Sequence, residues 1–220
     1  MSFELAVWHE PKPITREHAE DVFQTFRHGK SHGVSLRPEE PGASLSGEQE
    51  PAETHPGVVA FVERLPEAEP LSADFALVTV DLERADEVAA EVFALAAECG
   101  LVCYDPQRGL VHNLSPRGVY PTMEMRTGDG MIVVAPDLGL ISDALATMSP
   151  QNPFTALVVF GEHFVQSSPE ISGYELEYKD SVRDRMFRTH IPDLEAVQTA
   201  FIEYATGERA FLERHDWRLV

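Results

Sequence analysis

Residues 75–106 place the strongest constraint on the fold, because a strand, a helix and a second strand follow one another there. FALVTVDL (75–82) is rich in β-branched and apolar residues, RADEVAAEVFALAAECG (84–100) has helical periodicity, and LVCYDP (101–106) is again apolar. The glycine that ends the helical segment is typical of a helix C-cap. The segment therefore predicts a β-α-β unit.

A further strand and helix are predicted upstream of this unit. FELAVW (3–8) has the character of a short strand, and Thr15 is placed to cap a helix that follows it. The apolar residues of that helix recur at helical spacing: Ala19, Val22, Phe23 and Phe26. With residues 75–106, these elements indicate a split β-α-β arrangement that resembles half of a ferredoxin-like sandwich.

The C-terminal half is predicted to be an antiparallel β-meander with flanking helices. TALVVFG, HFVQSS, GYELEYKD and RMFRTHI form four short strands separated by turn residues, and WRLV at the end is a candidate edge strand. Asp137 and Asp193 are placed to cap helices before and after the meander. Residues 117–130 are interpreted as a connector, and MIVV after them as a strand or as the start of the next helix.

The predicted class is therefore α+β, with an N-terminal domain at residues 1–116 and a C-terminal domain at 117–220. Residues 29–56 have no periodicity and are rich in Pro, Glu, Gly and Ser, which predicts a flexible acidic loop. The part from Glu39 to Glu53 is either a second binding segment that covers a basic surface or a simple insertion. Deleting residues 38–52 and measuring partner binding separates these two interpretations.

Charge limits the kinds of partner. The chain has 220 residues, with 37 Asp and Glu against 17 Lys and Arg, which gives a formal net charge of -20. Such a charge repels phosphate backbones and anionic lipid, so neither nucleic acid nor a membrane surface is expected as a partner. It attracts basic protein surfaces, although acidity also serves solubility alone.

Two cysteines, Cys99 and Cys103, exclude a disulfide framework and suit a reducing compartment. The N-terminus has no apolar stretch typical of a signal peptide, and no window approaches the roughly 20 apolar residues of a transmembrane helix. We therefore expect a cytoplasmic protein. The two cysteines flank a predicted helix end and strand start, so we interpret them as buried apolar residues and not as metal ligands.

No sequence motif indicates catalysis. The chain lacks a Gly-rich phosphate loop and a nucleophile elbow. His28 and His32 are four residues apart, but no acidic residue stands between them as in a zinc peptidase, and the adjacent glycines disfavour a helix there. The nine histidines are otherwise scattered. We predict no catalytic residue, no metal ligand and no cofactor, and we expect the protein not to be an enzyme.

The most informative positive feature is the predicted hairpin at residues 173–191. Alternation places Tyr174, Leu176 and Tyr178 on one face of the sheet and charged residues on the other. The candidate partner-binding residues are Glu175, Glu177, Asp180, Asp184, Arg188 and His190. The alternative is a solvated face whose charges only pair across the strands. Under the binding hypothesis, reversing Glu175 and Glu177 to Arg weakens partner binding with little change in melting temperature.

Three segments carry a family resemblance: FELAVWHEPKPIT, ERADEVAAEVFALAAECGLVCYDPQ and GYELEYKDSVRDRMFRTHIPDLEAVQTAFIEYATG. Together they are similar to small acidic actinobacterial proteins, some of which are predicted immunity proteins of polymorphic-toxin systems. The C-terminal half resembles the immunity group paired with deaminase or nuclease toxins. That group has a G-Y-x-L-E-Y-x-D hairpin before its last helix and a tryptophan near the C-terminus, matched here by residues 173–180 and Trp217.

This resemblance implies a stoichiometric inhibitor of a cognate, basic toxin domain. Two alternatives stay open: a regulatory interaction module that has no toxin partner, and a metal-dependent enzyme on a ferredoxin-like scaffold. A neighbouring gene for a large secreted protein with a variable C-terminal domain favours the first hypothesis. Metal analysis of the purified protein tests the enzyme. Exposed edge strands are compatible with either a monomer or a homodimer.

Overall fold

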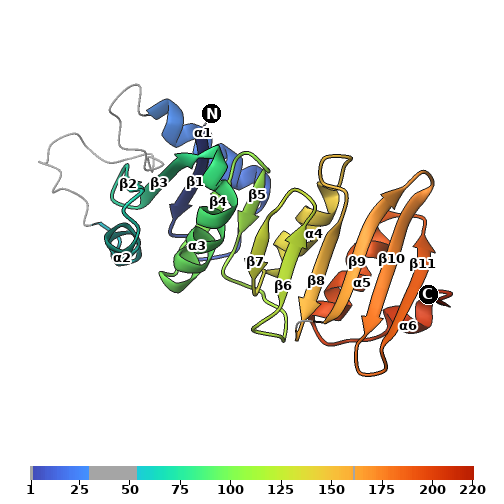
Figure 1. The fold of residues 1–220 in the computed structure, drawn as a ribbon. Helices are drawn as coiled ribbons and strands as arrows, with labels where there is room; N and C mark the ends of the chain where they lie inside the picture. The colour runs from blue at the N-terminus through green and yellow to red at the C-terminus, as the bar shows by residue number, and fades with distance from the viewer. Residues whose placement is uncertain (1, 30–53, 161) are drawn as a thin grey trace, which may run out of the picture.

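The computed structural model describes residues 2–29, 54–160 and 162–220 and confirms a mixed α+β fold. Two antiparallel sheets lie side by side, each with its own helices (Figure 1). The predicted loop at 29–56, with its candidate segment from Glu39 to Glu53, falls on residues that lie almost entirely outside this described part. None of the helices in the described ranges combines the length and the apolar character needed to cross a membrane.

The five-stranded sheet contains the predicted split β-α-β arrangement. Its strand order is β2 (Ala68–Pro70), β3 (Phe75–Asp81), β1 (Ser2–Trp8), β4 (Val102–Asp105) and β5 (Leu110–His112). Strand β1 is antiparallel to both β3 and β4, so β3 and β4 run parallel on either side of it. A short 3-10 helix, η1 (Leu82–Arg84), and helix α3 (Ala85–Glu98) connect them. The edge strands β2 and β5 were not predicted, because three residues are too few to show a period.

Helices cover both faces of this sheet. Helix α1 (Arg16–Gly29) packs on one face, where Phe23 lies among Trp8, Phe75 and Tyr104. Helices α2 (Pro56–Arg64) and α3 pack on the other face against odd-numbered residues of β1, such as Leu5 and Val7. Burial on both faces explains why FELAVW is apolar at almost every position.

The seven-stranded sheet contains the predicted meander. Its strand order is β12 (Arg218–Leu219), β11 (Arg185–Ile191), β10 (Gly173–Asp180), β9 (His163–Glu170), β8 (Thr155–Val159), β6 (Glu124–Thr127) and β7 (Ile132–Val134). The prediction that residues 117–130 form only a connector is wrong, because β6 lies within them and pairs with both β7 and β8. The EMRT sequence of β6 is short and polar, so it carries little strand signal.

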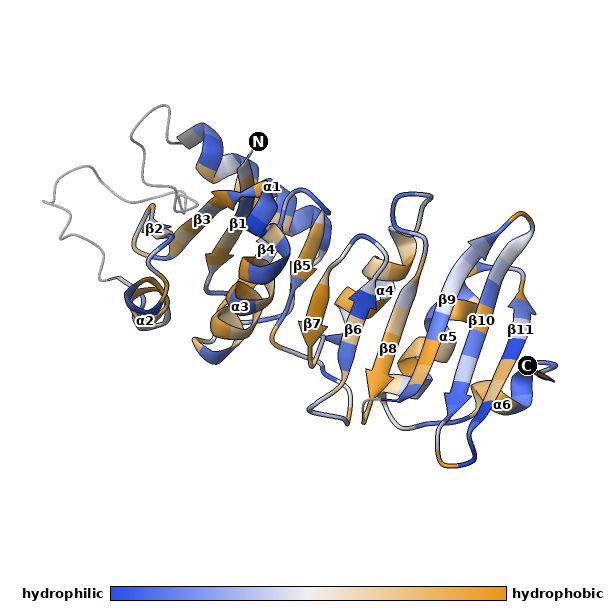
Figure 2. Cartoon of the chain, in the orientation of Figure 1, coloured by the Kyte–Doolittle hydropathy of each residue, from blue (hydrophilic) through white to orange (hydrophobic). Residues whose placement is uncertain are grey.

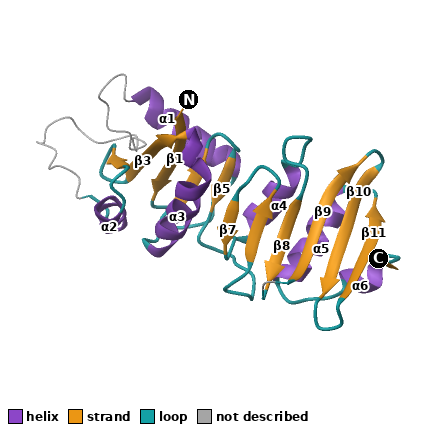
Figure 3. Cartoon of the chain, in the orientation of Figure 1, coloured by secondary structure: helices purple, strands orange, loops and turns teal. Residues whose placement is uncertain are grey.

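Three helices cover one face of the seven-stranded sheet: α4 (Leu138–Ala146), α5 (Leu194–Ala205) and α6 (Phe211–Arg214). As predicted, the side chains of Asp137 and Asp193 cap α4 and α5, accepting hydrogen bonds from backbone amides in the first turn. Helix α6 was not predicted, since four residues show no periodicity. Figure 3 shows these helices on the far side of the strands.

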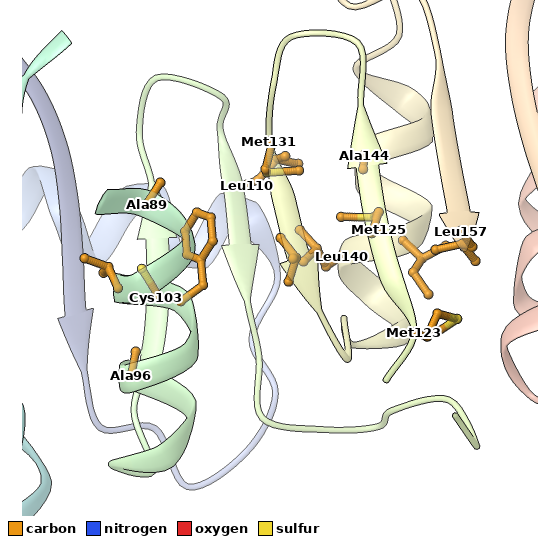
Figure 4. Packing of buried hydrophobic residues seen from close by; sticks show 14 of the residues in the cluster. Ala89, Ala96, Cys103, Leu110, Met123, Met125, Met131, Leu140, Ala144 and Leu157 are labelled. Carbon is orange, nitrogen blue, oxygen red and sulfur yellow. The ribbon is translucent and has the colours of Figure 1, made fainter. Parts of the chain in front are cut away.

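The two sheets share one hydrophobic core. The predicted boundary at residue 116 falls between β5 and β6, which is where the chain passes from one sheet to the other. A continuous cluster of buried residues crosses this boundary, with Cys103 and Leu110 on one side and Met125 and Leu140 on the other (Figure 4). Arg108, in the β4–β5 turn, adds a polar link: it pairs with Asp105 at 2.9 Å and with Asp129 of the β6–β7 turn at 2.7 Å.

Candidate functional site

The candidate site is the face of the seven-stranded sheet opposite α4, α5 and α6, which we call the open face. Strand register places one residue of each strand in a row across it: Ile132, Arg126, Ala156, Gln166, Glu177, Arg188 and Arg218. A second row contains Val134, Glu124, Val158, Phe164, Lys179 and Met186. Figure 3 shows α4, α5 and α6 on the opposite side of this sheet, whereas α3 comes near it at the edge strand β7.

The structure brings four of the six predicted site residues together on the open face. Glu175 is opposite His190 and Glu177 is opposite Arg188 in the β10–β11 register, as the alternation predicted. The side chains between them, such as Leu176 and Ile191, are buried on the helical side. The hairpin pattern in the sequence therefore assigned these residues to the correct face.

Arg188 holds Glu175 and Glu177 in place, and we call these three residues the Arg188 group. Its guanidinium donates to Glu177 Oε1 from Nε at 3.1 Å and from Nη2 at 2.7 Å, and its Nη1 lies 3.1 Å from Glu175 Oε2. Gln166 donates to the other carboxylate oxygen of Glu177 at 3.2 Å. These bonds raise the pKa of Arg188, and the hydrogen bond to Glu177 contributes most.

Glu177 is therefore not a free surface charge. Only 7% of the residue is exposed. Reversing its charge would place two guanidinium groups side by side in a nearly buried position and leave Gln166 without its acceptor. The expectation that reversing Glu175 and Glu177 to Arg changes the melting temperature little does not fit this geometry at Glu177. Alternation shows which face a residue is on but not how deeply its neighbours cover it.

The other predicted residues have local partners. His190 Nδ1 lies 2.8 Å from Glu170 Oε2 on the open face. Asp180 and Asp184 lie at the β10–β11 turn, where they pair with Arg183 at 3.2 Å and Lys179 at 2.5 Å. The two aspartates thus belong to the hairpin end, apart from the Arg188 group.

Sequence reasoning missed the apolar component of the open face. Val134 is 58% exposed and Ile132 is 46% exposed, and Val158, Phe164 and Met186 are half-buried. Val158 and Phe164 are direct cross-strand neighbours at the centre of the sheet. Strand β8 is hydrophobic after its first residue, Thr155, whereas β10 and β11 carry many hydrophilic residues (Figure 2). A strand with one solvated face normally alternates, so the unbroken TALVV run was the available signal.

The charges of the open face are balanced, unlike those of the chain as a whole. Arg126, Lys179, Arg188 and Arg218 are the cations of the two rows, and Glu124 and Glu177 are the acids. Glu175 and Glu170 add two more carboxylates on this face, so four acids meet four cations. The net charge of -20 therefore has its origin elsewhere, including the exposed side of α3.

The remaining candidates for chemistry are dispersed. Cys103 is buried, and burial raises the pKa of its thiol far above the ordinary value; Cys99 is half-buried. His28 is the final histidine of α1, whereas His32 lies outside the described part of the chain. Across residues 2–29, 54–160 and 162–220, no three His, Cys, Asp or Glu side chains are grouped to hold a metal ion.

His112 has an unusual environment between the two sheets. It is opposite Cys103 in the β4–β5 register, and its ring stacks on Phe93 of α3 with 3.8 Å between centroids. Both ring nitrogens are buried and have no hydrogen-bond partner among the described residues. Burial, with the nearby charge of Arg108 as a second cause, lowers the pKa of His112 to about 3. The ring is therefore neutral at physiological pH and part of the core.

Comparison with protein-family models, with curated proteins and with solved structures finds no match to this chain. The fold class is thus established by the structure itself. Function has to be inferred from the open face, the charge distribution and the resemblance of the sequence segments.

Proposed function

We propose that this protein is an immunity protein: a stoichiometric inhibitor that neutralises a cognate toxin domain, of nuclease or deaminase type, by binding it through the open face. The single observation that carries the proposal is the second row of the open face, in which four of the six residues are apolar. We call it the apolar row. An antiparallel sheet commonly exposes one face to water, and that face is then polar. Here Val134, Val158, Phe164 and Met186 interrupt the polar pattern.

The composition of the open face supports protein binding. Protein interfaces combine an apolar, poorly charged centre with a polar rim, and exposed apolar patches mark such surfaces. The open face has Ala156, Val158 and Phe164 near its middle and the Arg188 group toward its β12 side. Because Arg188 already holds Glu175 and Glu177 in place, a partner meets a preorganised surface and does not have to immobilise these side chains.

The identity of the partner as a toxin rests on the resemblance of the three sequence segments. A net charge of -20 supports a basic partner, since an acidic protein steers basic surfaces toward itself over distances of about 10 Å at moderate salt. Enzymes that act on nucleic acid present such surfaces. Inhibition by binding needs no catalytic group in the inhibitor, and we propose none.

Co-expression tests this function. If a large secreted protein with a variable C-terminal domain is encoded beside this chain, that domain is the partner to use. We expect it to arrest growth alone, to be tolerated with this protein, and to form a one-to-one complex in size-exclusion chromatography with light scattering. Failure of both rescue and complex formation would overturn the immunity function.

A matched pair of variants tests the face. Phe164→Glu places a carboxylate in the apolar centre, and we expect it to weaken the complex at least about 100-fold, which corresponds to losing a central contact. Ile171→Glu makes the same change at the exposed β9–β10 turn, off the open face, and is expected to bind as the unmodified protein does. If the Phe164→Glu variant still rescues growth, the protein is an inhibitor but does not bind the toxin through the open face.

A further inference from the structure

A hollow of about 270 Å³ lies where α3 meets β7 and the start of α4. Its buried lining is mostly apolar, with Phe93, Leu101, Val133 and Leu140, and includes Asn113 and Asp137 near the start of α4. The neutral His112 ring lines it as well, stacked on Phe93. A lining of this kind accepts an apolar group and disfavours a charged one.

The walls leave room for a side chain. On the α3 side the lining residues Ala94 and Ala97 are small, and Ala94 is exposed. On the β7 side Val134 is 58% exposed and is also a residue of the open face. Ala135 follows with φ 50, a left-handed conformation that is unfavourable for alanine and that turns the chain sharply from β7 toward α4.

An acidic stripe runs along α3 beside this hollow. Glu87, Glu91, Ala94 and Glu98 are all exposed and are spaced to lie on one side of the helix. Glu98 pairs with Arg64 at 2.6 Å. Within the part of the chain that the structure describes, neither Glu87 nor Glu91 forms an ion pair. The stripe therefore has negative charge that no neighbouring cation offsets, in contrast to the paired glutamates of the open face.

We propose that this hollow is the anchor pocket for the protein partner, which inserts an apolar side chain between α3 and β7 and sets an adjacent Lys or Arg against Glu87 and Glu91. The inference rests on the proposed function and adds the chemistry that the partner must present at this point. It extends the open face without a break, since Val134 belongs to both. A concave apolar pocket beside unpaired charge is where binding energy concentrates in protein interfaces.

Arg117 is the competing charge at this site. It lines the hollow on the side away from α3, is exposed, and forms no ion pair with the described residues. A partner carboxylate would favour Arg117, whereas a partner cation would favour the α3 stripe. The sign of the charge next to the apolar group thus decides between the two, and the proposal commits to the cation.

Two dipeptide probes test the pocket without the partner: N-acetyl-Phe-Lys-amide and N-acetyl-Phe-Glu-amide. Each is titrated into the isotope-labelled full chain, and backbone amide shifts are followed by NMR. We expect the Lys probe to shift the resonances of Ala94, Ala97 and Val134 and to bind about fivefold more tightly than the Glu probe, as expected for one screened charge contact. Raising the salt to about 1 M should remove the difference.

Variants then localise the effect. Ala94→Trp should fill the pocket and abolish the shifts, whereas Ala146→Trp, at an exposed position of α4, should leave them unchanged. Glu87→Gln with Glu91→Gln should remove the preference for Lys and retain apolar binding. No shift at these resonances, equal affinity for the two probes, or tighter binding of the Glu probe would each overturn the proposal.

These experiments distinguish failure of the anchor pocket from failure of the immunity function. If the toxin domain binds and Phe164→Glu weakens the complex while Ala94→Trp does not, the function stands and the anchor pocket is rejected. If the Lys probe binds selectively but the toxin domain forms no complex, the pocket stands and belongs to a different basic partner.

Discussion

The two sheets of this protein differ in how they are covered. The five-stranded sheet has α1 on one face and α2 and α3 on the other, so β1, β4 and β5 are buried on both sides almost throughout. The seven-stranded sheet has helices on one face, and its other face is open (Figure 3). In β1, β4 and β5 almost every side chain is buried and contributes to stability. In the seven-stranded sheet, alternate side chains are on the open face, and stability should tolerate substitution of the exposed ones, though not of the buried Glu177.

The largest difference should appear when a phenylalanine is removed from each sheet. Phe23 on α1 is 1% exposed and packs against Tyr104 with ring centroids 5.7 Å apart. Phe23→Ala should lower the free energy of unfolding by about 3–5 kcal/mol. Phe164→Ala on the open face should lower it by about 1 kcal/mol or less, because the side chain is only half-buried. Urea denaturation measures both, and similar losses would contradict the distinction between the sheets.

The arginines provide a second comparison. Arg108 has a side chain that is 13% exposed and pairs with Asp105, whose side chain is fully buried. Arg108→Ala should cost about 3 kcal/mol, because it leaves a buried carboxylate unpaired and removes the link to Asp129. Arg188 has a side chain that is 46% exposed, so water can replace part of its contacts with Glu175 and Glu177, and Arg188→Ala should lower stability clearly less than Arg108→Ala does.

Thermal denaturation at neutral pH checks this pair of arginine variants. Lys at each position is the control, since it retains the charge without the forked geometry. We expect Arg108→Lys to recover only part of the stability. If Arg108→Ala and Arg188→Ala lower stability equally, the difference in burial between the two arginines does not determine how much their ion pairs contribute.

His112 and Asp137 line the junction between the sheets and have opposite effects on stability as pH changes. Burial lowers the pKa of His112 to about 3, against about 6.5 when unfolded. The unfolded chain then binds the extra proton, and stability falls as pH is lowered through this window. Burial raises the pKa of Asp137 to about 6, against about 3.9 when unfolded. The folded chain then holds the extra proton, and stability rises as pH is lowered from about 6 to 4.

The two contributions should therefore offset each other between about pH 4 and 6. Asp137→Asn retains a capping side chain for α4 and removes one titration. Its free energy of unfolding should fall more steeply toward acid than that of the unmodified protein, by up to about 1.4 kcal/mol per pH unit. His112→Phe retains the stacked ring and should give the opposite slope. Urea denaturation at several pH values measures these slopes, and parallel curves for all three proteins would contradict the prediction.

The sequence predicted secondary structure best where an element is long enough to show a period or where a capping residue marks its start. The β-α-β unit, the meander and the capped helices α4 and α5 were all predicted, because seven or more residues show a period or because a cap marks the start. Strands β2, β5 and β6 were missed. They are stabilised by pairing with neighbouring strands, and their own short sequences carry little strand signal. The same limit explains β7, whose four-residue MIVV segment fitted two interpretations.

The candidate site shows the same limit. Alternation within one hairpin placed Glu175, Glu177, Arg188 and His190 on one face. The apolar row needs the register of β7, β6, β8 and β9, which lie far apart in sequence or were not predicted, and local patterns do not contain that register. The burial of Glu177 depends on Gln166 from a neighbouring strand. The hollow between α3 and β7 depends on how the two sheets meet, and no local pattern specifies that.

The smallest predicted effects involve backbone conformation at the ends of two elements beside the hollow. Gly100 ends α3 with φ 72, and a Cβ there would meet no atom within 4 Å. Gly100→Ala should thus lower stability by about 1 kcal/mol through conformation alone. Ala135 ends β7 with φ 50, so Ala135→Gly relieves an unfavourable conformation but adds flexibility to the unfolded chain, and should raise stability by about 0.5 kcal/mol. Calorimetry should therefore show a loss of stability for Gly100→Ala and a gain for Ala135→Gly. A loss of stability in Ala135→Gly would mean that contacts of the Ala135 methyl group outweigh the strain at the edge of the proposed pocket.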